Sequence, residues 1–75
     1  MGEIFRIRNL RVCIYPKDHL PAHLHVLGPG AEAKFEIEHM ECFFSRGFKK
    51  STLNEIKAIL LNEKKLLMEV WNENQ

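Results

Sequence analysis

Alternation of apolar and polar residues on both sides of one turn signal constrains this chain more than any other feature. Residues 23–27 read H-L-H-V-L, residues 28–30 are Gly-Pro-Gly, and residues 31–38 alternate again. Successive side chains of a β-strand point to opposite faces, so the pattern predicts a half-buried hairpin. One face is apolar, and the other carries two histidines, three glutamates and one lysine.

The apolar faces of the two strands must match, because a slip of one residue would turn a whole apolar set toward solvent. A four-residue loop over 27–30 satisfies this condition. In the resulting register His25 lies opposite Glu32, and His23 lies opposite Lys34. We expect both imidazoles to be displayed to solvent, since the residues between them must face the core.

Other segments predict further strands. The runs 4–8 and 11–15 are rich in β-branched and aromatic residues and predict a second hairpin, which Pro16 ends because proline has no amide proton for a ladder. The stretch 39–47 is ambiguous: it fits either another short strand or an irregular segment. We expect both cysteines, Cys13 and Cys42, to be reduced and buried.

From residue 51 onward the periodicity becomes helical. At about 100° per residue, six apolar residues fall within roughly a third of the helix circumference. They are Leu53, Ile56, Leu60, Leu67, Val70 and Trp71. Thr52 and Glu55 have the spacing of a capping box, and Asn62 marks the point where one helix could break into two. Three apolar residues off this stripe, Leu61, Leu66 and Met68, are left for a partner surface.

Together these patterns predict an α+β fold. We expect a small antiparallel sheet of three to five strands with a C-terminal helix or helix pair packed on one face. Residues 1–75 fit a single domain, because a chain of this length has room for one core.

The charge balance excludes a strong overall field. Eleven lysines and arginines stand against ten acidic residues, so nucleic acid could be attracted only by a local basic patch, Arg46, Lys49 and Lys50. The two cysteines lack the paired spacing of a structural zinc site. With no apolar run long enough for a bilayer and no signal segment, we expect a cytoplasmic protein that does not enter membranes.

The histidines suggest two kinds of chemistry. His19, His23 and His25 could supply imidazoles to zinc, nickel or copper, with Glu32 as a further ligand or as a group that orients His25. Lys34 opposite His23 would oppose a cation, and histidines on solvent-facing strands are common without metal. No cofactor other than such an ion is predicted.

The alternative is acid and base catalysis. His23 and His25 could exchange protons in a ribonuclease or nucleotide-processing toxin, while Lys34 and Arg46 stabilise a phosphate. This signal is weak, because any polar sheet face displays such residue types.

Four segments in chain order resemble a known family. They are PAHLHV at 21–26, AKF at 33–35, SRGF at 45–48 and WNE at 71–73. The pattern is similar to that of a small bacterial domain of unknown function, numbered forty-one sixty, over nearly the whole chain. Ala22 departs from it, since the family usually has a second proline there.

The resemblance implies a compact α+β domain, often encoded beside another small domain in a toxin–antitoxin-like pair. It marks His23, His25, Lys34 and Arg46 but implies no known reaction. Our leading hypothesis is therefore a binding or regulatory module that acts through a small protein partner, such as an adjacent-gene product. Self-association through the C-terminal helix, a ribonuclease-type toxin and a divalent-metal-binding domain are the alternatives.

Overall fold

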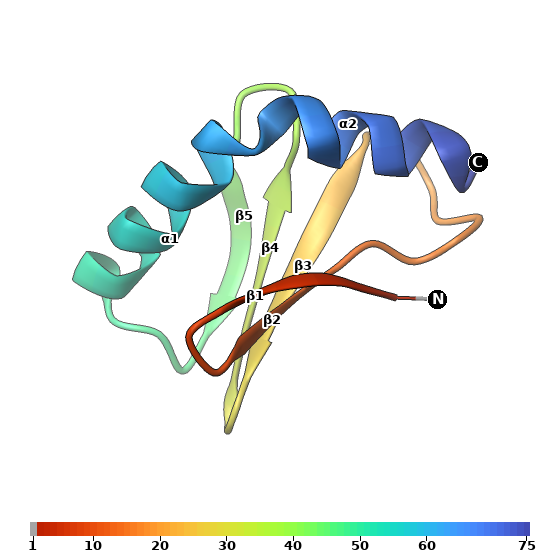
Figure 1. Ribbon diagram of the computed structural model, residues 1–75. Helices are drawn as coiled ribbons and strands as arrows, with labels where there is room; N and C mark the ends of the chain where they lie inside the picture. The colour runs from red at the N-terminus through yellow and green to blue at the C-terminus, as the bar shows by residue number, and fades with distance from the viewer. Residues whose placement is uncertain (1) are drawn as a thin grey trace.

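The computed structural model describes residues 2–75, which form one five-stranded antiparallel sheet followed by two helices (Figure 1). The strands are β1 (Glu3–Ile7), β2 (Leu10–Cys13), β3 (His23–Gly28), β4 (Ala31–Glu36) and β5 (Cys42–Arg46). The helices are α1 (Lys50–Asn62) and α2 (Lys64–Glu73). The strands lie in the sheet in chain order, so the predicted α+β fold is confirmed.

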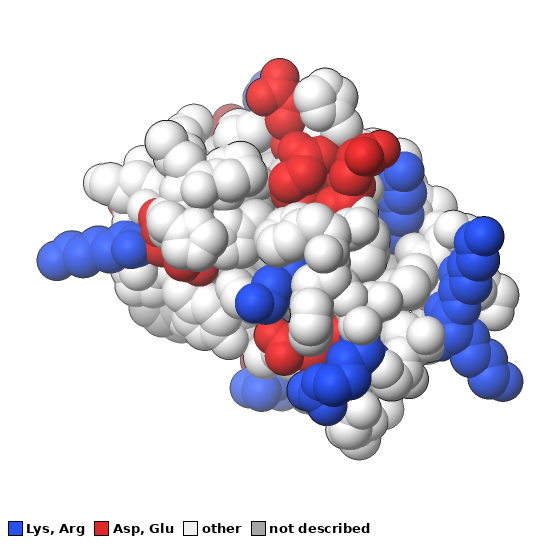
Figure 2. All heavy atoms as spheres, turned by 180° about the vertical axis from the view of Figure 1, so that it is seen from behind, with Lys and Arg blue, Asp and Glu red and all other residues white. Residues whose placement is uncertain are grey.

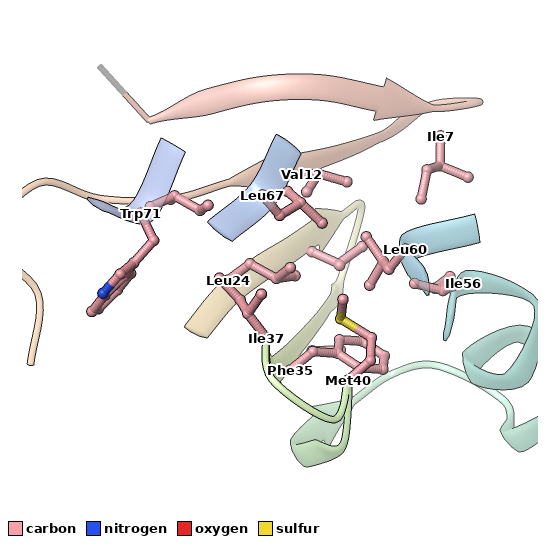
Figure 3. Packing of buried hydrophobic residues seen from close by; sticks show 13 residues of the cluster. Ile7, Val12, Leu24, Phe35, Ile37, Met40, Ile56, Leu60, Leu67 and Trp71 are labelled. Atoms are coloured by element: carbon pink, nitrogen blue, oxygen red, sulfur yellow. The ribbon is translucent and has the colours of Figure 1, made fainter. Parts of the chain in front are cut away.

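The helix pair covers one face of the sheet, and apolar side chains from both layers meet between them (Figures 1 and 3). All six residues of the predicted helical stripe belong to this contact. Ile56, Leu60, Leu67 and Trp71 are buried, and Leu53 and Val70 pack against them. Met68, predicted to be free for a partner, also packs against the core, whereas Leu61 and Leu66 are exposed.

The helix ends differ in part from the prediction. α1 begins at Lys50 after Lys49, and no side chain caps it, so the predicted capping box at Thr52 and Glu55 is wrong. The helix starts before Thr52 and places it inside the first turn. The predicted break near Asn62 is confirmed, because α1 ends there and Glu63 separates the two helices. Neither described helix is long and apolar enough to cross a membrane.

The central hairpin keeps the predicted faces but not the predicted register. Gly28 pairs with Ala31, so the loop has two residues, and the pairing is shifted by two positions from the predicted one. His25 lies opposite Lys34, and His23 lies opposite Glu36. A shift of two positions preserves which side chains face the core, which is why matching apolar faces could not exclude it.

The short loop is explained by its two residues. Proline fixes φ near −65°, and Gly30 has a φ of 65°. This combination is the one that a type II turn requires. The two residues therefore close the hairpin tightly and let β3 continue to Gly28.

The ambiguous stretch contains a strand. Residues Cys42–Arg46 form β5, which pairs with β4 on one side only and is an edge of the sheet. All five of its residues are exposed, so the prediction that Cys42 is buried is wrong, whereas Cys13 is buried as predicted.

Gly47, directly after β5, should tolerate no side chain. Its φ is 82°, and a Cβ there would collide with the carbonyl oxygen of Gly30. We expect Gly47→Ala to lower the free energy of unfolding by about 1–3 kcal/mol or more, measured by urea denaturation. Gly30→Ala is the matched control: its φ is also positive, but its Cβ would meet open space. Equal losses in the two variants would contradict the role of the close contact.

Candidate functional site

The loop between β2 and β3 folds back over the start of β3 and brings Asp18 to two histidines. His23 Nε2 lies 2.9 Å from Asp18 Oδ2, and His25 Nε2 lies 3.6 Å from the same oxygen. The ligand atoms of these three residues all lie within 4.8 Å of one another. We call Asp18, His23 and His25 the His/Asp cluster. The backbone N–H of Lys17 donates to the carbonyl oxygen of Asn74 at 3.0 Å, which fastens the loop to the end of α2.

His23 is held at both ring nitrogens. Nδ1 lies 2.8 Å from the carbonyl oxygen of Pro21, which can only accept a hydrogen bond, so Nδ1 carries a proton. The opposite nitrogen faces Asp18. The ring centroid lies 5.4 Å from that of Trp71 and 5.9 Å from that of Phe43, and the residue is only 3% exposed. The expectation that His23 is displayed to solvent is therefore wrong, because the loop, α2 and β5 cover it.

His25 sits between two carboxylates. Its Nδ1 lies 3.6 Å from Glu32 Oε2, and its Nε2 faces Asp18. The side chain is only 13% exposed, so the expectation that it is displayed to solvent is wrong for His25 as well. Its Nε2 is a buried nitrogen without a hydrogen-bond partner among the described residues. Leaving such a group unsatisfied costs about 1–3 kcal/mol. The ring of Tyr15 packs edge-on against it, with the two centroids 4.8 Å apart.

The electrostatics of the cluster favour an ionised carboxylate. Partial burial alone would raise the pKa of Asp18, but the backbone N–H of His19, 3.0 Å from Oδ1, and the neighbouring imidazoles lower it overall. Burial raises the pKa of the Cys13 thiol and that of the Tyr15 hydroxyl. Asp18 is therefore ionised at neutral pH, while the nearby Cys13 and Tyr15 stay protonated.

The other predicted site residues are placed differently. His19 is on the loop, as predicted, and its side chain is 82% exposed, with Nε2 3.9 Å from Asp18 Oδ1. Lys34 carries its ammonium over the ring of Phe44, 5.2 Å from the centroid. Arg46 lies 3.6 Å from Glu32. The structure thus brings His23 and His25 together, and it links Arg46 to His25 only through Glu32.

Sequence reasoning missed Asp18, although a signal was present. Asp18 precedes His23, the first of the two alternating histidines, by five residues. A loop of that length can fold back and bring the carboxylate to the imidazoles. The proline at 21 supports such a loop, because it biases the preceding residue away from helix.

A second surface surrounds the exposed edge of the sheet. Phe43 and Phe44 on β5 are 54% and 40% exposed. Figure 2 shows the molecule from behind, where acidic side chains lie among lysines and arginines rather than in one field of a single sign. The basic patch residues Arg46, Lys49 and Lys50 are all exposed.

Fold and site define a small α+β domain with an open five-stranded sheet, a helix pair on one face and a largely buried His/Asp cluster at the start of β3. Residues 9–72 match the family model described as domain of unknown function DUF4160, and the chain belongs to this family. No curated protein and no solved structure matches the chain significantly.

Removing the carboxylate should destabilise the fold in a pH-dependent way. We expect Asp18→Ala to lower the free energy of unfolding by about 1–3 kcal/mol at pH 7, because it takes the acceptor from His23. Since the folded-state pKa of Asp18 is lowered, its contribution is present above the ordinary aspartate pKa and is lost as the pH falls through the folded-state value.

Urea denaturation at a series of pH values between 7 and 2 measures this difference. Glu69→Ala, which removes an exposed carboxylate from α2, is the control. A difference between wild type and Asp18→Ala that stays constant across the series would contradict the assignment.

Proposed function

We propose that this domain is a binding module whose β5 edge accepts a strand or an apolar segment from a small protein partner. The observation that carries the proposal is the exposure of the whole strand: all five residues from Cys42 to Arg46 are exposed, and no described strand pairs with its outer edge. The outer backbone N–H and C=O groups are therefore open to an added strand.

The composition of β5 supports this role. Soluble proteins usually protect edge strands with charges or proline, because an apolar edge invites pairing with another chain. β5 has one charge and no proline, and it exposes Phe43 and Phe44 instead. The opposite edge differs, since the apolar residues of β1 are buried or half-buried against the core. An aromatic edge of this kind is the composition expected of an interface core.

The family resemblance supplies the kind of partner. It implies that members are encoded beside another small domain, and on that ground we propose an adjacent-gene product in a toxin–antitoxin-like pair as the partner. Leu61 and Leu66 on the helix pair offer a competing surface, which would serve self-association through the C-terminal helix.

The ribonuclease alternative stays a prediction. Both ring nitrogens of His23 already face acceptors, and Arg46 faces Glu32. Lys34 holds its ammonium over Phe44. No contact in the described residues aims these groups at a common phosphate position, so no observation favours this reaction over binding.

Co-expression with the adjacent-gene product tests the proposal. We expect a stable complex by size-exclusion chromatography with light scattering, and Phe44→Glu should weaken it about tenfold or more in calorimetry, equivalent to about 1.4 kcal/mol. A glutamate at 44 faces Lys34 and should leave the fold intact.

Leu61→Glu is the matched control, because it places the same charge on an exposed apolar position of α1. Loss of the complex with Leu61→Glu but not with Phe44→Glu would move the interface to the helices. A domain that remains monomeric and uncomplexed at high concentration with the adjacent-gene product would refute the binding function.

A further inference from the structure

We propose that Asp18, His23 and His25 bind one divalent transition-metal ion of the zinc class. The site adjoins the β5 surface, because Phe43 packs against His23, but its ligand atoms are not part of the strand edge, so each proposal has its own test. The set differs from the histidine triad expected from the sequence, because the carboxylate of Asp18 takes the place of His19 in the group of converging atoms.

The spacing of the donor atoms is suitable. Imidazole nitrogens and carboxylate oxygens lie about 2.1 Å from zinc, so two ligands of a tetrahedral ion are about 3.4 Å apart. The two nitrogen–oxygen separations here are 2.9 and 3.6 Å, and all three donor atoms lie within 4.8 Å of one another. Small rotations of the side chains would bring the three atoms around one ion.

The outer nitrogens of both histidines are already oriented as in metal centres. A metal-binding histidine usually donates its other ring N–H to a carbonyl or a carboxylate. His23 Nδ1 is 2.8 Å from the carbonyl oxygen of Pro21, and His25 Nδ1 faces Glu32 Oε2 at 3.6 Å. Both rings therefore direct Nε2 toward Asp18, and a bound ion would replace the proton shared between His23 Nε2 and the carboxylate, which is released to solvent.

An independent observation points to a missing ligand of His25. Its Nε2 is buried and has no hydrogen-bond partner among the described residues, although it lies in a polar cluster. Buried polar atoms in folded proteins are nearly always satisfied. A cation shared with Asp18 would satisfy this nitrogen without moving the strand.

The donor set selects the class of ion. Two neutral imidazoles and one carboxylate favour zinc, cobalt, nickel or copper, whereas magnesium and calcium prefer oxygen ligands alone. The objection that Lys34 would repel a cation at His23 does not hold in the observed register. Lys34 pairs instead with His25, which is also a proposed ligand, but its ammonium lies over the ring of Phe44 on β5, the neighbour of β4 on the side away from β3.

His19 lies on the loop beside the three ligands. His19 is exposed, and its ring centroid lies 5.1 Å from that of His23. Its Nε2 lies outside the converging set, so we assign three protein ligands and leave the fourth position to water. His19 is then a neighbour of the ion and not one of its ligands.

Titration of the tag-free domain with Co²⁺ tests the site, because this ion replaces zinc and reports its coordination through visible absorption bands. We expect one equivalent to bind with a tetrahedral or five-coordinate spectrum and Zn²⁺ to displace it. His25→Gln should raise Kd by about 100-fold or more, and Glu32→Gln, which removes an orienting group, by about tenfold. Excess Zn²⁺ should also raise Tm of the wild type, since the ion binds the folded state only.

His39→Gln is the matched control, because His39 is an exposed histidine beside a carboxylate, Glu36, outside the cluster. It should bind Co²⁺ like the wild type, and so should His19→Gln. Circular dichroism without metal establishes that each variant is folded, and Asp18→Asn provides a second ligand variant. The proposal is overturned if no stoichiometric ion binds, if His25→Gln and Asp18→Asn bind as well as His39→Gln, or if His19→Gln alone abolishes binding. The cluster would then be a metal-free ion pair.

Discussion

The inward packing of Leu24 and Val26 is the constraint on which the rest of the structure depends. Both side chains are completely buried beneath the helix pair, so the alternate residues of β3, His23 and His25, must lie side by side on the opposite side of the strand. Their ring centroids are 5.3 Å apart. Helix packing against Leu24 and Val26 thereby turns both imidazoles to the other side of β3, where His23, at the first position of the strand, still reaches Trp71 of α2. Any chemistry at the cluster rests on that core contact.

Periodicity predicted most of the fold because it reports burial directly. The helical stripe, the break after Asn62 and the two faces of the central hairpin all follow from which residues must avoid water. Periodicity does not determine the pairing register of β3 with β4. Pairings that differ by two positions bury the same faces, and only the preference of Pro29 and Gly30 for a tight turn distinguishes them.

The candidate site was less predictable because it depends on contacts between segments that are distant in the sequence. Alternation places the two histidines on one face, but it says nothing about a loop folding over them. The contacts of His23 with Phe43 and Trp71 join the start of β3 to an edge strand and to the last helix. Those segments are remote in sequence, so neither the burial of His23 nor the participation of Asp18 follows from local pattern.

The hydrogen bond from the backbone N–H of Lys17 to the carbonyl oxygen of Asn74 connects the loop that carries Asp18 to the C-terminal end of α2. Asn74 directly follows α2, at a point where helices ordinarily fray. Linked equilibria are reciprocal. A ligand that immobilises the carboxylate of Asp18, the residue after Lys17, therefore also stabilises the last turn of α2 against unwinding. Conversely, a ligand that pulls the end of α2 away from the sheet would loosen the loop and with it the donor atoms. The loop between β2 and β3 and the C-terminal end of α2 are thus energetically coupled through one short polar contact.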